Sequence, residues 1–228
     1  MLFLLIPAAY LAVGYLCHYL LFPEKKPDIK HYFQPGHVFY SKAEGVRQTV
    51  LRQEGGVVYC HAVIEPYAPG PPKHIHARFD EHFAVANGEL SIWYGGTVKK
   101  IRPGETLLIP KGMPHKPFNE TGESIAVAGE IHFPEQFAFY LSQIYGVFDR
   151  NPRLAHPFHA VLQISLFQRA GFDSYIVDGP PVWVQQLTGF LLTPLARLMG
   201  YKSYYPEYQP QVEDMATGRT PARELAAP

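Results

Sequence analysis

Residues 73–83 of the chain read KHIHARFDEHF. Neighbouring side chains of a β-strand point to opposite faces, so His74 and His76, two residues apart, are expected on one face. Glu81 opens a second run of alternating apolar residues, which ends at an Asn-Gly turn signal at 87–88. This pattern predicts one hairpin that presents two imidazoles and one carboxylate on the same side. Such donors suit a borderline divalent metal such as Fe, Mn, Ni, Co or Zn.

A fourth donor is expected from residues 104–119, which read GETLLIPKGMPHKPFN. A short apolar strand at 106–109 runs into Pro110, Gly112 turns the chain, and His115 follows. The end of this strand therefore offers a third imidazole to the same site.

Together the two stretches resemble the two sequence motifs of the cupins. The first cupin motif is HxH, three or four residues, Glu, six residues and Gly, matched here by His74, His76, Glu81 and Gly88. The second is G-x5-PxG-x2-H-x3-N, matched at every spacing by Gly104, Pro110, Gly112, His115 and Asn119. One departure is the leading Gly that cupins carry six residues before the first His, because here Gly70 stands four before it. The resemblance covers residues 36–132, a little under half of the chain.

The resemblance implies a divalent metal (Fe, Mn, Ni or Zn) held by four ligands, His74, His76, Glu81 and His115. Glu81 is also the candidate catalytic residue. Two alternatives stay open. The barrel could be metal-free, although cupins without a metal have usually lost one or more of these ligands. A register slip of one residue would replace Glu81 by Asp80, whereas regular alternation turns Asp80 and His82 outward.

The remaining pattern predicts a mainly β fold with a single antiparallel cupin β-barrel, or jelly roll, over residues 36–133. Short apolar runs separated by turn signals, with no helix between them, are typical of such barrels. The strands are expected at 37–41, 46–53, 57–66, 90–94, 97–101, 106–109, 113–118 and 124–133. The 22 Pro and 19 Gly fit a fold with many turns. No internal repeat is visible, so one barrel is expected.

A helical C-terminal extension is expected over residues 134–209. Apolar residues recur at helical steps near 137–148, 157–170 and 182–199, the second with Pro at its first position and Gly directly after its end. The third helix is expected either to pack on the barrel or to lie as an amphipathic helix in a membrane interface. The tail at 210–228 is polar and contains Pro, which predicts disorder.

Residues 1–22 carry no charge and are largely apolar, and at helical rise they span about 33 Å, enough to cross a bilayer. They predict a transmembrane helix, followed by a linker over residues 23–35. Three lysines follow within 25–30, and the positive-inside rule then places the catalytic domain of a single-pass membrane protein in the cytoplasm. A cleavable signal peptide or a lipoprotein signal fits less well, because the start is not basic and bulky residues precede Cys17. The remaining alternative is a helix packed on the chain itself or on a dimer partner.

Charge and cysteine content disfavour two broad classes of protein. The net charge is zero and no basic block occurs, which disfavours nucleic-acid binding because phosphate contacts need clustered Lys and Arg. The two cysteines, Cys17 and Cys60, lie in separate expected elements and are expected to be free thiols. No disulfide scaffold is therefore predicted.

A six-coordinate metal with three His and one Glu keeps two positions for water, O2 or substrate. By resemblance to the cupins, we expect a membrane-anchored metal enzyme, most simply an oxidoreductase of the dioxygenase type, acting on a small and largely apolar molecule. Isomerase and lyase chemistry are other options. The alternatives are a non-catalytic cupin module that binds or senses a ligand, and a metal that only stabilises the barrel. The expected partners are a small-molecule substrate, a membrane and, as in many cupins, a second copy in a homodimer.

The substrate pocket is expected at the mouth of the barrel. The candidate lining residues are Tyr59, His61, Phe83, Trp93, Phe118, Glu130 and His132. Glu130 and His132 share one strand face. They are expected either to assist proton transfer beside the metal or to face solvent or the C-terminal helices.

Overall fold

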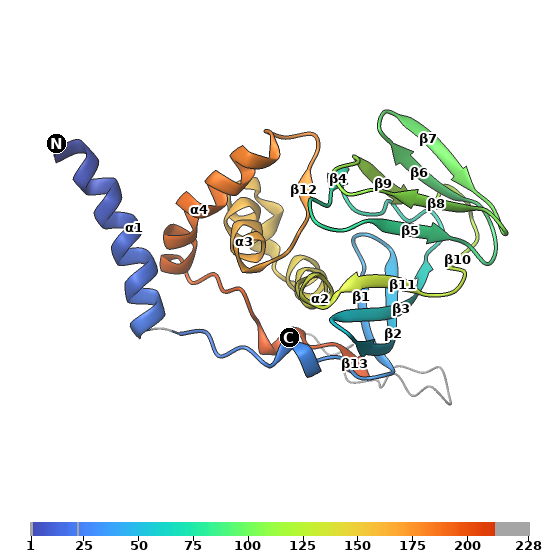
Figure 1. The fold of residues 1–228 in the computed structure, drawn as a ribbon, viewed down its shortest axis with the longest axis horizontal. Coiled ribbons are helices and arrows are strands. Elements are labelled where there is room, and N and C mark those ends of the chain that lie inside the picture. Colours follow the sequence, from blue (N-terminus) through green and yellow to red (C-terminus); the bar gives the residue numbers. More distant parts are fainter. Residues whose placement is uncertain (1, 22, 213–228) are drawn as a thin grey trace.

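The computed structural model describes residues 2–21 and 23–212, which form a β-barrel on one side and a group of helices on the other (Figure 1). One sheet has the order β10-β3-β2-β1-β13, with β11 also paired to β3. Its strands are β1 (His37–Ser41), β2 (Val46–Glu54), β3 (Val57–Ile64), β10 (Ile125–Ala126), β11 (Ile131–Pro134) and β13 (Gln211–Val212). The second sheet has the order β12-β4-β9-β6-β7, and β5 pairs with β8 separately. These strands are β4 (His74–Ile75), β5 (Glu81–Ala84), β6 (Leu90–Tyr94), β7 (Thr97–Ile101), β8 (Thr106–Ile109), β9 (His115–Phe118) and β12 (Tyr175–Ile176).

The predicted mainly β, antiparallel fold is confirmed, because the strand pairs of both sheets and of β5 with β8 run antiparallel. Alternation of side chains explains how β2 and β3 build one wall. Along β3 every second residue is buried, from Val58 to Ile64. The intervening residues point away from the interior, which gives the strand one apolar and one mixed face.

The predicted hairpin carrying His74, His76 and Glu81 is wrong. β4 pairs with β9 and β12, whereas β5 pairs with β8, so the two segments belong to different sheets. The chain leaves β4 after Ile75 and crosses to the other strand pair before Glu81. In this arrangement His74 lies directly opposite His115, its Cα partner in the register of β4 and β9.

The predicted long strand at 124–133 is also divided, into β10 and β11. Gly129 between them has a φ of 76°, a left-handed conformation that interrupts regular strand geometry. The division lets β10 and β11 pair with different parts of β3, at Val63–Ile64 and at Val57–Cys60.

Helix α2 (Glu135–Arg150) begins directly after β11 and covers the inner face of the first sheet at the open side of the barrel (Figure 1). Its apolar residues, including Phe137, Tyr140 and Ile144, pack into one core cluster with strand residues such as Phe39 and Val50. A second cluster lies between the strands, built around Phe83, Val85, Leu90, Ile92, Ile109 and Ile125. The space between these two clusters is where the site described below is located.

Helices α3 (Pro157–Ala170) and α4 (Val182–Leu198) pack against each other beside α2. The predicted helix at 157–170 is confirmed residue for residue, and it ends at Gly171, whose φ is 123°. The third helix was expected either to pack on the barrel or to lie in a membrane interface. In the structure, α4 contacts α3, α1 and the short strand β12. Among the described residues, short 3-10 helices connect the larger elements: η1 (Ile29–His31), η2 (Pro152–Ala155) and η3 (Pro206–Tyr208).

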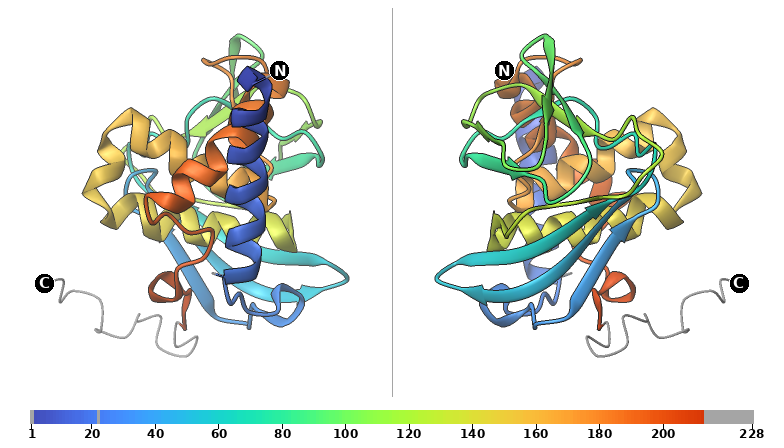
Figure 2. Two further views of the ribbon diagram at one scale, coloured as in Figure 1. Left: turned by 90° about the vertical axis from the view of Figure 1, so that its left-hand side faces the viewer. Right: turned by 90° about the vertical axis from the view of Figure 1, so that its right-hand side faces the viewer.

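Helix α1 (Leu2–Leu21) runs beside α4, away from the barrel (Figures 1 and 2). The Tyr10 hydroxyl donates to the carbonyl of Leu191, and Tyr15 stacks on Phe190 with ring centroids 5.3 Å apart. Among the described residues, no helix combines the length and the apolar character needed to cross a membrane. The transmembrane assignment of residues 1–22 is therefore not supported, and neither is the single-pass cytoplasmic orientation built on it. In the structure α1 contacts α4, as in the alternative of a helix packed on the chain itself.

The predicted disordered tail at 210–228 begins too early. Gln211 and Val212 form β13, which pairs with β1, and the rest of the predicted tail lies outside the described residues. Cys60 is a buried free thiol, as predicted, whereas the side chain of Cys17 lies outside the described part of the chain. The expected homodimer stays a prediction.

Candidate metal centre

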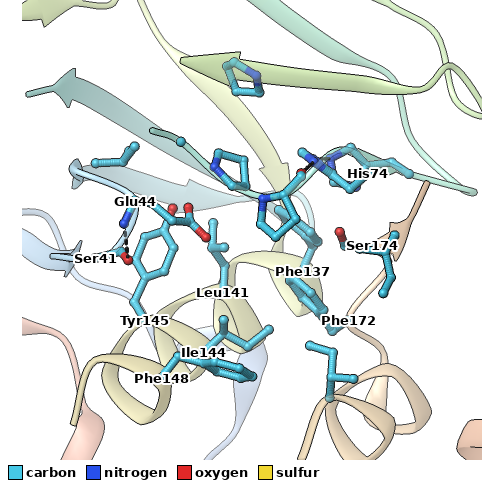
Figure 3. Close-up of a pocket in the computed structure, with 18 of the residues that line it drawn as sticks. Ser41, Glu44, His74, Phe137, Leu141, Ile144, Tyr145, Phe148, Phe172 and Ser174 are labelled. Carbon is cyan, nitrogen blue, oxygen red and sulfur yellow. Dashed lines mark hydrogen bonds between the residues drawn. The ribbon is translucent and has the colours of Figure 1, made fainter. Parts of the chain in front are cut away.

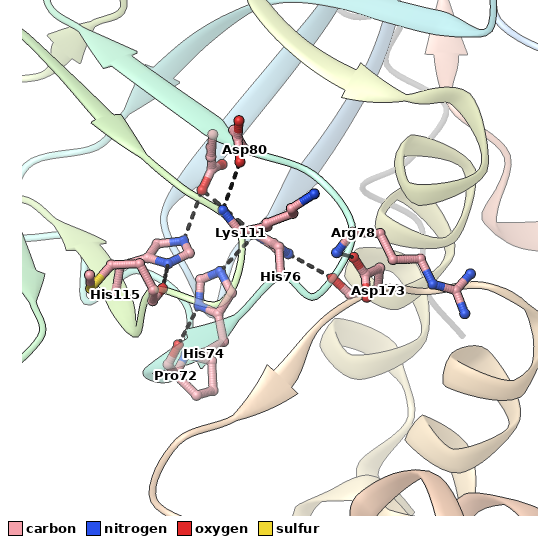
Figure 4. Close-up of polar contacts among 10 residues, drawn as sticks. Pro72, His74, His76, Arg78, Asp80, Lys111, His115 and Asp173 are labelled. Carbon is pink, nitrogen blue, oxygen red and sulfur yellow. Dashed lines mark hydrogen bonds and ion pairs between the residues drawn. The ribbon is translucent and has the colours of Figure 1, made fainter. Parts of the chain in front are cut away.

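Four buried side chains bring their donor atoms within 4.8 Å of one another: His74, His76, Glu81 and His115. Figure 4 shows the three imidazoles of this cluster. They come from three strand regions, because β4 supplies His74, the loop after β4 supplies His76, β5 supplies Glu81, and β9 supplies His115. All four candidate residues chosen from the sequence are thus brought together, although through sheet pairing that the sequence pattern did not predict.

Main-chain carbonyl groups fix the orientation of all three imidazoles. In each ring Nδ1 donates to a carbonyl, so Nε2 is the nitrogen that faces the centre of the cluster and offers a lone pair when the ring is neutral. The acceptors are the carbonyl oxygens of Pro72 (2.8 Å from His74 Nδ1), Asp173 (2.7 Å from His76 Nδ1) and Met113 (2.9 Å from His115 Nδ1). This arrangement exposes the ring nitrogens that can bind a metal.

The spacing of the donors fits a cation at the centre. His74 Nε2 and His76 Nε2 lie 3.2 Å apart, and two lone pairs at that distance repel unless a positive charge lies between them. The Glu81 Oε2 atom is 2.9 Å from His115 Nε2 and 3.6 Å from His76 Nε2. Ligands bound about 2.1 Å from one metal, at right angles to each other, are separated by about 3 Å. The donor set and its spacing therefore fit a divalent metal.

Burial sets the charge states of the cluster. Burial, together with the nearby His76 and His115, lowers the pKa of His74 to about 3. Burial alone would raise the pKa of Glu81, but contacts with His115 and His76 outweigh it and hold the pKa of this carboxyl below its usual value. Burial opposes protonation of His115 as well, yet the Glu81 carboxylate raises the pKa of this imidazole. A neutral imidazole at His74 and an ionised Glu81 are the forms that bind metals.

A largely apolar cavity of about 610 Å³ opens beside the cluster, between the barrel and helices α2 and α3 (Figure 3). His74, His76 and Glu81 form part of its lining. Apolar side chains from both the barrel and the helices form most of the rest, among them Phe83, Ile131, Phe133, Phe137, Leu141, Ile144 and Phe172. Any molecule in this cavity would contact the candidate ligands at one end.

Of the seven lining residues proposed from the sequence, Phe83 is the one that lines the cavity. Tyr59, His61 and His132 lie on the outward face of their strands, because the inward positions of β3 are the even-numbered residues. Glu130 forms an ion pair with Arg52 instead of approaching the cluster. The solvent-facing alternative for Glu130 and His132 is therefore the one the structure supports.

The neighbours of Glu81 resolve the question of register. Glu81 is buried and His82 is exposed, as the alternation predicted. Asp80 is exposed and accepts a hydrogen bond from the main-chain nitrogen of Lys111, at 2.7 Å. Asp80 is not part of the four-donor cluster.

Asp173 is a residue that the sequence reasoning missed. It lies in the loop between α3 and β12, is 6% exposed, and its Oδ2 atom accepts a hydrogen bond of 2.7 Å from the main-chain nitrogen of Arg78 (Figure 4). The same residue supplies the carbonyl that holds His76. An Asp two residues after a helix-ending Gly looks like an ordinary turn residue, so no sequence signal marks it.

Residues 60–131 match the Cupin domain family. The match supports assigning this segment to the cupin superfamily. The resemblance of the two motifs to the cupins is thereby confirmed for this segment, which contains His74, His76, Glu81 and His115.

Similarity beyond the cupin domain comes from a fungal protein. The chain is 25% identical over 228 residues to the probable oxidoreductase virH of Hypocrea virens (strain Gv29-8 / FGSC 10586), covering 89% of this chain and 99% of that protein. KdgF from Halomonas sp. is a similar solved structure, with 17% identity, a TM-score of 0.37, and coverage of 43% of this chain and 86% of its own. The TT1209 protein from Thermus thermophilus has 20% identity and a TM-score of 0.36, covering 49% of this chain and 98% of its own. Recombinant oxalate oxidase in complex with glycolate has 24% identity and a TM-score of 0.36, covering 49% of this chain and 62% of its own.

Proposed function

We propose that this chain is a metal-dependent cupin oxidoreductase that converts a small, largely apolar molecule in a dioxygenase-type reaction. The observation that carries the proposal is that a four-donor cluster forms one end of an apolar cavity of about 610 Å³. A cavity of this size suits an organic molecule of a few rings. The similarity to a probable oxidoreductase over 89% of the chain favours redox chemistry over isomerase or lyase chemistry.

In this proposal the metal would be held by His74, His76, Glu81 and His115. Fe, Mn and Ni suit both this donor set and O2 chemistry, whereas Zn suits the donor set but has no redox chemistry. When bound, such a metal supplies a Lewis acid and, if it is redox-active, a route for electrons. The Glu81 carboxylate offsets part of the positive charge. The three hydrogen bonds from Nδ1 to main-chain carbonyls keep the imidazoles in place, so little rearrangement is needed when substrate arrives.

The apolar lining performs two further tasks. Phe137 contacts the His76 ring edge to face, with ring centroids 5.0 Å apart, and stacks on Phe172 at 5.1 Å. These rings exclude water from the space next to the ligands and offer flat surfaces for an aromatic or alicyclic substrate. The side chains thus position the substrate rather than supply reactive groups of their own.

A dioxygenase-type reaction is balanced without an additional reductant. O2 is the oxidant, both oxygen atoms enter the product, and the substrate provides the electrons. The alternative function, a metal-containing cupin module that binds or senses a ligand without turnover, uses the same cluster and cavity. The two functions differ in whether O2 is consumed.

The test begins with full-length protein purified without chelator. Metal content is measured by mass spectrometry, and O2 uptake is measured with a panel of phenols and lipid-like alcohols. We expect about one divalent metal per chain and O2 uptake with at least one aromatic or alicyclic compound. The variants His115→Ala and Glu81→Gln should lose both metal and O2 uptake.

His132→Ala is the matched control, because it removes an exposed imidazole on β11 that lies outside the cavity. It should keep the metal content and the O2 uptake of the natural protein. If the protein binds metal and ligand but consumes no O2, the result would reject the enzyme function and support the non-catalytic binding module. Protein that binds no metal under any loading condition would refute both functions.

A further inference from the structure

The cavity has a second polar region that the cluster of metal ligands does not use. Figure 3 shows His74 on one side of the pocket, and Glu44 with Tyr145 on the other, with Phe137 and Leu141 between them. Glu44 comes from the turn between β1 and β2, and Tyr145 comes from α2. Both line the cavity.

Gln48 also lines the cavity, and its side-chain oxygen lacks a hydrogen-bond partner among the described residues. It lies on the inward face of β2, is 4% exposed and lines the cavity. Its side-chain carbonyl oxygen is buried, and within the described part of the chain no donor reaches it. A buried acceptor without a donor is costly, so a group that brings an O–H or N–H to this oxygen would be favoured.

The register of the sheet connects Gln48 to the other two residues. Gln48 pairs with Phe39 across β1 and β2, so their side chains share the inward face. The Phe39 ring lies 6.0 Å from the ring of Tyr145. Tyr145 in turn forms a hydrogen bond with the carboxyl group of Glu44. Phe39 thus connects Gln48 to the pair formed by Tyr145 and Glu44, and all three polar residues line the cavity.

Glu44 differs from an ordinary surface carboxylate in its charge state. Burial raises its pKa to about 7, although the Tyr145 hydrogen bond acts in the opposite direction and the charge of Asp149 adds to the rise. A carboxyl group that is partly protonated at neutral pH can both donate and accept hydrogen bonds. Such a group suits a neutral hydroxyl better than it suits an anion.

We propose that Glu44, Gln48 and Tyr145 form a second binding subsite, which recognises a hydroxyl group on an otherwise apolar ring compound. The apolar body of that compound would lie against Phe137 and Leu141, and its far end would reach the metal ligands. This inference rests on the proposed function for the reacting end of the substrate. The recognition of the hydroxyl group itself requires neither metal nor turnover.

The test uses three probes of nearly equal shape: 2-naphthol, 2-methoxynaphthalene and naphthalene. The first carries a hydrogen-bond donor, the second carries only an acceptor oxygen, and the third carries neither. Binding to full-length protein is measured at pH 7 by fluorescence titration in the absence of O2. We expect 2-naphthol to bind about tenfold more tightly than either of the other two, the range of one well-formed hydrogen bond to a buried acceptor.

Two variants remove the subsite in independent ways. Gln48→Met keeps the length of the side chain but removes the acceptor, and Tyr145→Phe removes the hydroxyl that contacts Glu44. Each should reduce the preference for 2-naphthol to less than threefold while naphthalene binding stays the same. Tyr140→Phe is the control, because Tyr140 is a buried tyrosine of the same helix that does not line the cavity, and it should keep the full preference.

The proposal is overturned if the natural protein binds the three probes equally or binds none of them. It is also overturned if the folded Gln48→Met and Tyr145→Phe variants both keep the preference. The same titration on His115→Ala separates this proposal from the function proposed above. Because the subsite needs no metal, this variant should keep the preference for 2-naphthol although it loses metal and O2 uptake. If the natural protein prefers 2-naphthol but neither holds metal nor consumes O2, the proposed subsite stands and the proposed enzyme function is refuted.

Discussion

The His76 imidazole donates a hydrogen bond of 2.7 Å from Nδ1 to the main-chain carbonyl oxygen of Asp173, a residue 97 positions further along the chain. His76 belongs to the barrel, and Asp173 belongs to the loop that follows α3. The helical extension therefore completes the orientation of a barrel residue, and the candidate metal centre depends on both parts of the fold.

Removing the Asp173 side chain should weaken metal binding without removing a ligand. Asp173→Ala eliminates the acceptor of the Arg78 main-chain N–H, so the loop that presents the carbonyl to His76 loses its anchor. Groups that orient ligands typically change metal affinity by about 10–100-fold. Asp173→Asn, which keeps an acceptor oxygen, should retain most of the affinity. Competition titration with a metal-sensitive dye measures the effect.

Asp178→Ala is the matched control for that experiment, since this exposed carboxylate pairs with Lys73 at 3.3 Å and makes no contact with the cluster. It should bind metal like the natural protein. Equal affinities for Asp173→Ala and Asp178→Ala would show that the loop does not position His76.

Removing the metal should destabilise the fold, because the facing lone pairs of His74 and His76 lose the charge between them. At a free metal concentration of about 1,000 times the dissociation constant, binding contributes about 4 kcal/mol. For a chain of this size the loss should lower Tm by roughly 10 °C. Differential scanning fluorimetry with and without chelator measures the shift. His115→Ala should show no response to chelator, and a natural protein equally insensitive would argue against metal binding.

The Glu44 carboxyl predicts how stability depends on pH. Its pKa in the folded protein is about 7, above the ordinary value of 4.5 that applies to the unfolded chain, because burial penalises the charge. The folded state therefore holds this proton more tightly, and stability falls as pH rises from 4.5 through 7. Tyr145 and Asp149 are the titratable groups that act on it.

Glu44→Gln removes this dependence while keeping an oxygen that can accept from Tyr145. Relative to the natural protein, the variant should gain stability between pH 5 and pH 8, with an upper bound of about 3 kcal/mol. Urea unfolding at the two pH values measures the difference. A difference that is constant across this range would mean that Glu44 titrates at its ordinary pKa.

Gly70 should be intolerant of any side chain. Its φ is 66°, and a Cβ atom at this position would lie 1.9 Å from the carbonyl oxygen of Pro117, two residues beyond His115. Gly70→Ala should therefore cost about 3 kcal/mol or more, combining left-handed strain with a clash against main chain. Gly55→Ala isolates the strain, because Gly55 has a φ of 59° and open space around it. Its cost should be only about 1 kcal/mol, and equal losses in the two variants would show that the clash relaxes.

The spacing of the two motifs was sufficient to identify the four donors and most of the strands. His74, His76, Glu81 and His115 were chosen from the sequence, and the structure brings them together. Motif spacing is informative because a pair of residues on one short segment must fall on the same face. The hairpin that was expected to join them was wrong, since alternation fixes which face a residue occupies but not which strand lies beside it.

The apolar residues 1–22 predict a helix, and the structure forms α1 there, but the membrane span expected of this helix is not supported. An apolar helix is stabilised equally by lipid or by another helix, and composition does not distinguish the two environments. Contacts with α4 through Tyr10 and Tyr15 became visible only when both helices were placed. The polar tail was misjudged for the same reason, because β13 is formed by pairing with β1 at the other end of the chain.

By itself, the sequence determined the chemical types of the donors, the barrel class and the existence of the C-terminal helices, because these follow from local spacing and periodicity. Only the tertiary structure decided which surfaces enclose the cavity. Glu44, Gln48, Tyr145 and Asp173 come from a turn, a strand, a helix and a loop, and nothing local relates them. Their convergence results from α2 and α3 closing the open side of the barrel, which is a property of long-range packing.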